Sequence, residues 1–335
     1  MNKPPITRRS ALAATLATSF AAALARPAAA ADVHEVVMAV SSTSFAIGGV
    51  RIGQQTGIFE RNGIKLNIVV MDSGSATMGA LISGSAQFVV AGPGEMMAAR
   101  AQGVDVAIVA DTYHNSAVWV VLSKAAAAKL AVKQNAPQHD RLKAMDGLLI
   151  AVPSATSSFT APIRSAAVDA GATLRFTYMA QPAMVAALEA GAIDGMVAAF
   201  PFAARPVTKG TGVVWIDGVH GDFPPASMPA SSSSMLTTWG YYTANTDIVT
   251  RVQKSMAEVA VFIQQHPAEA RAALIRGYSD MSADEVGLAY DQQSQAWTYP
   301  FLNLDDMRQE LKLLRMSVDL PGLANLDLTR TLFPH

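Results

Sequence analysis

The sequence predicts an α/β fold of two lobes with a ligand cleft between them. Short apolar segments rich in Val and Ile alternate with Ala-rich segments of helical period. This alternation occurs twice along the 335 residues. Strand–loop–helix units of this length imply parallel strands joined by right-handed crossovers. A chain of this length can form two compact lobes, each with its own hydrophobic core.

The first α/β unit is expected to begin near residue 36. Its strands are predicted at 36–40, 66–70, 88–91 and 106–110, with helices between them that end at Gly57 or Gly63, at Gly84 and at Gln102. The helix before Gly84 is expected to hold Met78, Leu81 and Ile82 on one apolar face.

A second, smaller unit follows. Strands are predicted at 148–152, 176–179, 193–199 and 213–216, with helices that end at Gly171 and Ala190. We interpret 119–122 as a connecting strand and the Gly/Pro/Ser-rich residues 218–234 as a linker. A strand at 235–242 and helices from 248 onward complete the chain. The first lobe is therefore predicted to comprise 32–114 and 233–335, and the second lobe 115–232.

Composition excludes several classes of protein. With 51% hydrophobic and 15% charged residues and a mean hydropathy of +0.25, the chain lacks the signature of disorder. The 25 Lys and Arg are balanced by 26 Asp and Glu, so we expect no nucleic-acid partner. The absence of cysteine excludes disulfides, Cys-ligated metals, Cys nucleophiles and a lipid on an N-terminal Cys.

Residues 1–31 have the pattern of a cleaved bacterial signal peptide. A cationic start is followed by the apolar run Ala11–Ala25 and by small residues up to Ala31, and the pair Arg8-Arg9 favours the twin-arginine route. The run is too short and too Ala-rich for a membrane anchor. Removal of four cations and no acids leaves a formal net charge of −5. We therefore expect a soluble periplasmic protein without a lipid anchor.

Three polar loops follow predicted strands and precede predicted helices: Asp72–Ser75, Gly92–Glu95 and Ser154–Ser158. Ligands of open parallel sheets bind outside the carboxyl ends of the strands, where helix N-termini favour anions. Ordinary helix capping explains any one such loop. Three loops divided between both lobes favour one shared binding site.

No catalytic or metal-binding motif accompanies these loops. We expect neither a metal nor a cofactor. Among the histidines only His114, at a strand end near the presumed hinge, is predicted to reach the pocket. Glu95 has two interpretations, since a carboxylate is stabilised at a helix N-terminus and can also accept a hydrogen bond from an amino group. Asp305-Asp306 is interpreted as a helix cap.

The aromatic residues divide into two groups. Trp119 and Trp215 lie in apolar runs and are predicted to be core. The others fall at strand ends or in loops, where they would form the walls of a cleft for an organic ligand: Phe45, Tyr113, Phe159, Phe200, Phe202 and Trp239.

Several segments resemble periplasmic binding proteins of the nitrate/sulfonate/taurine type, which serve ABC importers. Five segments carry the resemblance: Arg51–Ile64, Gly79–Phe88, Ala101–Val106, Leu142–Val152 and Ala187–Gly195. The resemblance implies a two-lobed type II periplasmic-binding-protein fold that closes on a small ligand. It also implies an ABC permease and its ATPase as partners, and we expect a monomer.

The resemblance also implies where the ligand binds. We add Tyr113, His114 and Gln181 because they lie at the ends of predicted strands or the start of a predicted helix. The predicted site then comprises Ser42, Thr43, Phe45, Ser73, Ser75, Gly94, Glu95, Tyr113, His114, Ser154, Thr156, Ser157, Ser158, Gln181, Phe200 and Phe202. The family often has Glu-Pro where this chain has Phe200-Pro201-Phe202, and Gln87 replaces a common Asp. The first change removes a charge near the cleft.

Several functions stay open at this point. Uncharged hydroxyls and aromatic walls favour a small organic anion, such as a sulfonate, a taurine-like solute or an aromatic carboxylate, with Arg164 or Arg205 as a counter-ion. A thiamine-pyrimidine precursor or another nitrogenous solute, bound around Glu95, is the alternative. A pyrimidine-synthase-like enzyme is disfavoured by the export signal and by the lack of cysteine. The sequence does not distinguish import from delivery to a sensor.

Overall fold

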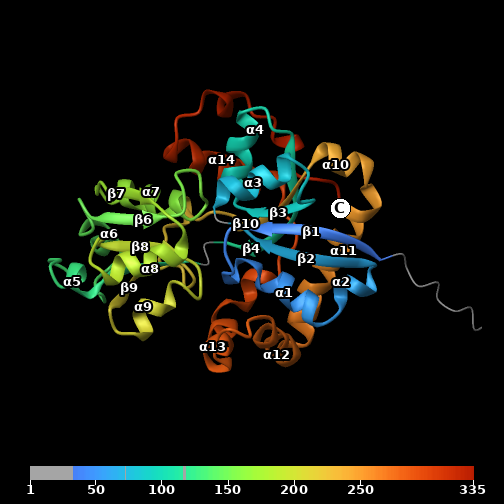
Figure 1. Cartoon of the computed structure of the whole chain (residues 1–335). Helices are drawn as coiled ribbons and strands as arrows, with labels where there is room; N and C mark the ends of the chain where they lie inside the picture. The colour runs from blue at the N-terminus through green and yellow to red at the C-terminus, as the bar shows by residue number, and fades with distance from the viewer. Residues whose placement is uncertain (1–32, 72, 116–117) are drawn as a thin grey trace, which may run out of the picture.

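Two five-stranded sheets, each covered by helices, lie side by side in the computed structural model (Figure 1). The structure describes residues 33–71, 73–115 and 118–335. The predicted signal peptide lies outside them. The strands are β1 (His34–Val40), β2 (Ile64–Val70), β3 (Phe88–Ala91), β4 (Val106–His114), β5 (Trp119–Ser123), β6 (Leu149–Val152), β7 (Arg175–Tyr178), β8 (Gly195–Ala198), β9 (Gly212–Asp217) and β10 (Ser231–Thr238).

Helices occur between most of the strands and make up most of the chain after β10. They are α1 (Gly48–Gln55), α2 (Ile58–Arg61), α3 (Gly74–Ile82), α4 (Pro93–Ala101), α5 (Lys124–Ala127), α6 (Gln138–Lys143), α7 (Thr160–Asp169), α8 (Gln181–Glu189), α9 (Ala204–Thr208), α10 (Trp239–Ala244), α11 (Thr246–Gln265), α12 (Pro267–Gly277), α13 (Ala283–Gln293) and α14 (Leu304–Ser317). Five short 3-10 helices lie at Phe45–Ile47, Pro225–Ser227, Ser294–Trp297, Pro321–Asn325 and Leu328–Arg330.

The two sheets have the same topology. The first has the order β2-β1-β3-β10-β4 and the second the order β7-β6-β8-β5-β9. In each sheet three parallel strands are followed by one antiparallel strand, β10 or β5, and then by the edge strand. Each antiparallel strand is the first strand after the chain crosses from the other sheet. We call the parts around these sheets the first and second lobes.

Four sequence-based assignments are wrong. The residues 119–122 do not merely connect the lobes, because β5 lies inside the second sheet between β8 and β9. The serines Ser231–Ser234 are not linker, because they form the first half of β10 and are buried between β3 and β4. The strand predicted at 235–242 ends at Thr238, whose side chain caps α10. Ile82 is also exposed, whereas Leu81 is buried.

The chain crosses between the lobes twice, and the two crossings contact each other. Asn115 donates its backbone N–H to the Ala230 carbonyl at 2.9 Å, and Gly218 donates to the Val118 carbonyl at 3.1 Å. The division of the chain at 114/115 and 232/233 stays a prediction, although Ser231 and Ser232 already belong to the first sheet. Paired crossing strands allow two lobes to rotate as rigid bodies about one junction.

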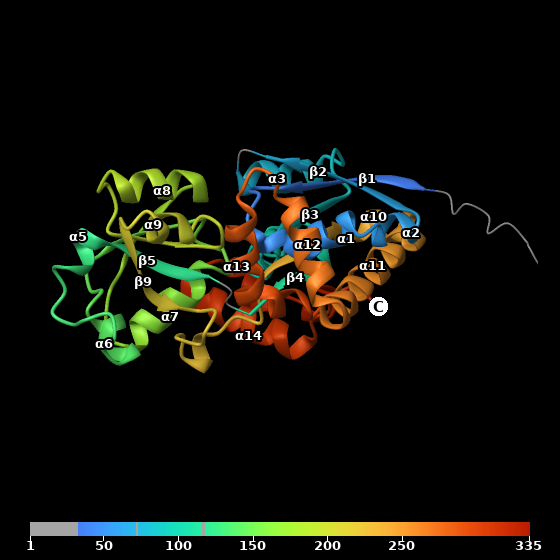
Figure 2. The ribbon, with the colours of Figure 1, turned by 90° about the horizontal axis from the view of Figure 1, so that it is seen from below.

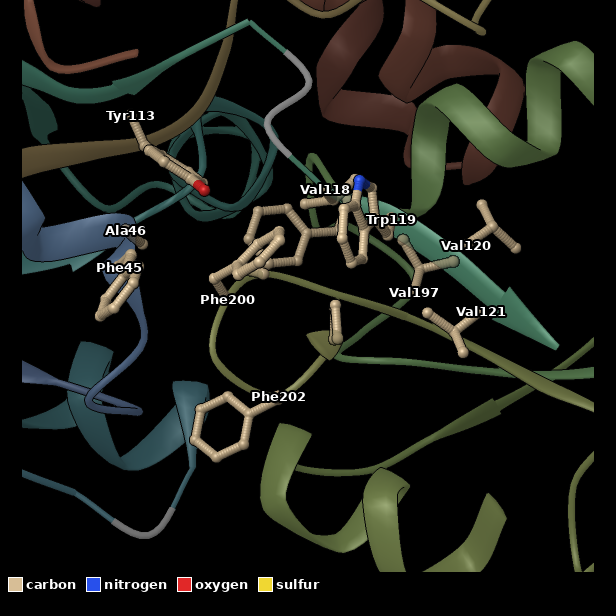
Figure 3. Close-up of a cluster of buried hydrophobic side chains, with 14 of the residues drawn as sticks. Phe45, Ala46, Tyr113, Val118, Trp119, Val120, Val121, Val197, Phe200 and Phe202 are labelled. Atoms are coloured by element: carbon tan, nitrogen blue, oxygen red, sulfur yellow. The ribbon is translucent and has the colours of Figure 1, made fainter. Parts of the chain in front are cut away.

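Buried aromatic side chains fill the junction between the lobes (Figure 3). Phe45 and Tyr113 of the first lobe belong to the same apolar cluster as Trp119 and Phe200 of the second. The Phe45 N–H also donates to the Phe200 carbonyl at 2.7 Å. Trp215 is buried in the second lobe, so both predicted core tryptophans are confirmed.

Candidate functional site

A cavity of about 600 Å³ lies between the lobes, at the carboxyl ends of the parallel strands. Segments after β1 and β3 and the start of α3 line it from the first lobe, and segments after β6 and β7 line it from the second. All three predicted polar loops contribute, although Asp72 itself lies outside the described residues. Figure 2 views the two lobes from below, with α8 on the second lobe and α3 on the first. This volume is in the range of clefts for small organic ligands.

Uncharged hydroxyl groups dominate the polar lining. They belong to Ser41, Ser42, Ser44, Ser73, Ser75, Thr77, Ser154, Thr156, Ser157, Ser232 and Ser233. Among the residues that the structure describes, no Lys, Arg or His lines this cavity. The helices α3, α4 and α8 begin at its wall, and the aligned peptide dipoles give a helix N-terminus partial positive charge. The lining therefore offers neutral hydrogen-bond donors instead of cations.

Glu95 is the one acidic side chain in this described lining. Its Oε2 accepts a hydrogen bond from the Gly92 N–H at 2.8 Å, as in a capping box for α4. Its Oε1 accepts from the Ser154 hydroxyl of the other lobe at 3.2 Å. Burial raises the pKa of Glu95, and these two hydrogen bonds oppose that rise. Both interpretations of Glu95 from the sequence are thus compatible with its position, since it caps α4 and faces the cavity.

Two glycines bring the lobes into close contact beside Glu95. A Cβ on Gly92 would lie 2.7 Å from the Ser158 hydroxyl, and a Cβ on Gly94 would lie 2.5 Å from the Thr156 carbonyl oxygen. The Gly94 N–H donates to Ser158 Oγ at 3.4 Å. Real Cβ atoms essentially never lie within 3.0 Å of a non-bonded heavy atom. The start of α4 therefore approaches the 154–158 loop only because these positions are glycines.

Gln181, the first residue of α8, links the lobes on another side of the cavity. Its Oε1 accepts from the buried Ala199 N–H at 2.9 Å, and its Nε2 donates to Ser42 Oγ at 3.5 Å. The Gln181 amide thus fixes the end of β8 and contacts the loop after β1. Gln181 is buried and has one hydrogen-bond partner in its own lobe and one in the other lobe. It therefore couples the cavity wall to the packing of the second lobe.

We expect Gln181→Ala to lower the free energy of unfolding by about 1–3 kcal/mol, because it leaves the Ala199 N–H buried without an acceptor. Gln181→Glu keeps an acceptor at the same place and is expected to lose less. Urea unfolding monitored by tryptophan fluorescence measures both variants. Equal stability of Gln181→Ala and the wild type would show that the Ala199 N–H finds another partner.

Half of the predicted site residues line the cavity. They are Ser42, Ser73, Ser75, Glu95, Ser154, Thr156, Ser157 and Gln181. Gly94 and Ser158 lie directly behind this wall, where the lobes touch. Thr43 is part of the loop after β1 but is not among the lining residues.

Phe45, Tyr113 and His114 of the predicted site do not line the cavity. Phe45 is fully buried against Tyr278 and Trp297. The Tyr113 hydroxyl donates to Gln293 at 2.5 Å. His114 stacks on Tyr299, and its Nδ1 lies 2.9 Å from the buried Asp111 carboxylate.

The segment Phe200-Pro201-Phe202 also packs inside the protein. Phe200 contacts the Trp119 ring at a centroid distance of 4.4 Å (Figure 3). Phe202 is buried, and the Arg205 guanidinium lies over its ring. Arg205 therefore does not act as the expected counter-ion in the cavity, and Arg164 instead stacks on Phe176. Large apolar rings at strand ends are buried here because the junction between the lobes needs a core of its own.

Sequence reasoning missed several lining residues. Ser232 and Ser233 of β10 reach the cavity from a segment that was interpreted as linker. Tyr178 and Met179 line it at the end of β7, and Tyr178 remains 52% exposed. The end of β7 is the carboxyl end of a parallel strand, the same signal that identified the three polar loops. Of the predicted wall aromatics, Phe159 does line the cavity.

In the described part of the chain, no group of three or more His, Asp or Glu side chains is arranged to hold a metal ion. Within the same residues no helix is both long enough and apolar enough to cross a membrane.

A family model described as the NMT1-like family matches residues 48–274, which is more than half of the chain. The chain belongs to the NMT1-like family. The matched region of this NMT1-like chain includes α1 and all of the second lobe's strands. A comparison with curated protein sequences gave no significant match.

Solved structures with the same fold cover most of this NMT1-like chain. A protein of Bordetella bronchiseptica RB50 is 18% identical with a TM-score of 0.73 over 89% of this chain and 94% of its own. The alkanesulfonate-binding protein SsuA of Xanthomonas axonopodis pv. citri, bound to MOPS, is 16% identical with a TM-score of 0.67 over 87% and 96%. The periplasmic nitrate-binding protein NrtA of Synechocystis PCC 6803 is 12% identical with a TM-score of 0.62 over 76% and 69%. The predicted two-lobed periplasmic-binding-protein fold is thereby confirmed.

Proposed function

We propose that this NMT1-like protein is the periplasmic solute-binding component of an ABC importer and that it captures a small organic anion between its lobes. One observation carries the proposal: hydroxyl groups and helix N-termini from both lobes line a single cavity without a cationic side chain among the described residues. Structural neighbours that bind an alkanesulfonate or nitrate support it. An ABC permease and its ATPase are then the partners that receive the solute.

The chemistry of the lining suits a sulfonate or carboxylate group better than a metal or a nucleotide. Serine and threonine hydroxyls and the Gln181 amide donate hydrogen bonds without adding charge, so an anion is held without a fixed ion pair. The apolar side chains of Met78, Phe159 and Met179 provide a surface for the organic part of the solute. Because both lobes supply donors, binding favours the state in which the lobes are closed.

Titration calorimetry with alkanesulfonates, arylsulfonates and aromatic carboxylates tests the ligand class. We expect at least one of these probes to bind with a dissociation constant in the micromolar range or below. If none gives heat while an aminopyrimidine binds, the ligand is a nitrogenous solute centred on Glu95 and the organic-anion proposal is wrong.

Small-angle scattering tests the closure itself. At saturation with the calorimetrically identified probe we expect a smaller radius of gyration than in the free protein, because the lobes approach over the ligand. A radius of gyration that is the same with and without bound probe would contradict capture by lobe closure.

A further inference from the structure

We propose that Glu95 is a specificity-determining residue that selects a solute carrying an N–H donor in addition to its acidic group. The inference rests on the proposed function and narrows its ligand class. It starts from the position of this carboxylate, which faces the same cavity as the hydroxyl groups that would hold an anion.

The capping role accounts for only part of the hydrogen-bonding capacity of Glu95. A carboxylate offers about four acceptor positions on its two oxygens. Oε2 receives the Gly92 N–H and Oε1 receives the Ser154 hydroxyl, so the described protein groups supply two donors. The remaining acceptor positions are available to a donor that enters the cavity.

Glu95 also determines where an acidic group can bind. Its Oε1 lies 3.8 Å from the place where a Cβ would stand on Gly74, so the carboxylate sits beside the start of α3 as well as that of α4. A second anion at either of these helix N-termini would face Glu95 directly. The acidic group of the solute is therefore expected beside Ser42, Ser44 and Gln181 at the start of α8, which hydrogen-bond to one another and line the same cavity.

This arrangement orients the solute. Its acidic group is held by the hydroxyls and the α8 terminus, and its N–H donor points to Glu95 across the cavity. A solute with an acidic group but no N–H donor leaves the Glu95 carboxylate desolvated without a new partner when the lobes close. A buried carboxylate left without a partner separates the affinities of two solutes more strongly than a difference in their apolar contacts does.

Both an ammonium group and a neutral amine can donate an N–H to Glu95. Pairs of probes with and without the amino group distinguish these two kinds of donor. Calorimetry is carried out on the full chain with 2-aminoethanesulfonate and ethanesulfonate, and with 3-aminobenzenesulfonate and benzenesulfonate. A fifth probe, 2-(trimethylammonio)ethanesulfonate, keeps the positive charge and removes the N–H groups. We expect at least one amino-substituted sulfonate to bind at least about tenfold more tightly than its N–H-free partner. We expect the trimethylated probe to lose that advantage.

Glu95→Gln is expected to reduce the ratio of the two dissociation constants to about one, because its single amide oxygen accepts the Gly92 N–H and its NH2 group then faces Ser154 and the cavity. The matched variant Glu60→Gln, on the exposed surface of α2, is expected to keep the wild-type ratio. Thermal melting verifies that both variants fold. If Glu95→Gln does not fold, the comparison of the trimethylated and amino probes on the wild type still decides the inference. Equal binding of amino-substituted and N–H-free sulfonates, or a preference that survives in Glu95→Gln, would overturn the inference and leave the proposed function intact. Absence of binding by every sulfonate and carboxylate would overturn both.

Discussion

Replacing Gly94 by Ala is expected to hold the two lobes apart and to weaken ligand binding about 5- to 100-fold. The new Cβ would lie 2.5 Å from the Thr156 carbonyl oxygen, which belongs to the backbone of the other lobe and cannot rotate away. Overpacking of this kind costs about 1–3 kcal/mol, and about 1.4 kcal/mol corresponds to a tenfold change in affinity. Separation of the lobes relieves the contact, so the cost falls on the closed state that binds the ligand.

The matched control is Gly79→Ala, in the middle of α3, where a Cβ would meet no atom within 4 Å. This variant is expected to bind like the wild type. Calorimetry measures the affinity of both variants. Small-angle scattering measures whether the radius of gyration of Gly94→Ala stays at the value of the open, ligand-free protein when the probe is saturating. An affinity of Gly94→Ala within threefold of the wild type would show that the 154–158 loop moves to accommodate the methyl group.

Much of the fold could be predicted from the sequence because its elements are locally defined. Apolar runs such as 36–40 and 88–91 form strands, and glycines such as Gly84 and Gly171 end helices with the positive φ that suits glycine. The convergence of three polar loops followed from topology, since the carboxyl ends of parallel strands meet at one edge of each sheet.

The errors share a different cause, which is that long-range pairing decides the outcome. Ser231–Ser234 has the composition of a linker, but its backbone pairs with β3 and β4, and Ser231 donates its hydroxyl to the buried Asp111 at 2.7 Å. A polar strand can be buried where another polar group accepts hydrogen bonds from its hydroxyl groups. No local pattern in residues 231–234 indicates that Asp111, 120 positions earlier, supplies that acceptor.

The aromatic residues illustrate the same limit within the candidate site. Phe45 begins the 3-10 helix after β1 and Phe200 follows β8, as cleft walls do, yet both pack in the junction between the lobes (Figure 3). Whether an aromatic at a strand end faces a ligand or a junction depends on the relative position of two lobes. That position is set by the two chain crossings, which periodicity along the sequence does not describe.

The junction also contains a buried acid whose titration is expected to affect stability. Glu310 of α14 is 2% exposed and accepts a hydrogen bond from the Ser231 N–H at 3.1 Å, at the start of β10. Burial raises the pKa of Glu310 from 4.5 to about 8, and the nearby carboxylates of Asp111 and Asp306 act in the same direction. Helix α14 packs against α4 of the first lobe and α7 of the second, so this acid lies where three elements meet.

The sign of the effect follows from proton linkage. Between pH 4.5 and about 8 the folded protein keeps a proton on Glu310 that the unfolded chain has released. The free energy of unfolding therefore falls as the pH rises through this window. Above the window the contribution of Glu310 no longer changes with pH, and the buried carboxylate keeps its full destabilising effect. A shift of this size corresponds to about 3–5 kcal/mol at 1.36 kcal/mol for each pKa unit.

Glu310→Gln replaces the protonated acid by a neutral group of the same shape that can still accept from Ser231. At pH 5 we expect the free energy of unfolding of the variant to be equal to or lower than that of the wild type. At pH 9 we expect it to be higher, and the difference changes between pH 4.5 and about 8. Urea unfolding at pH 5, 6.5, 8 and 9 measures this difference, and Glu35→Gln, on the exposed end of β1, serves as control. A difference between wild type and Glu310→Gln that does not change with pH would mean that Glu310 titrates alike in the folded and unfolded chains. If the difference does change, the pH dependence arises at the contact between α14 and β10, because Glu310 loses its proton beside the strand that returns the chain to the first lobe.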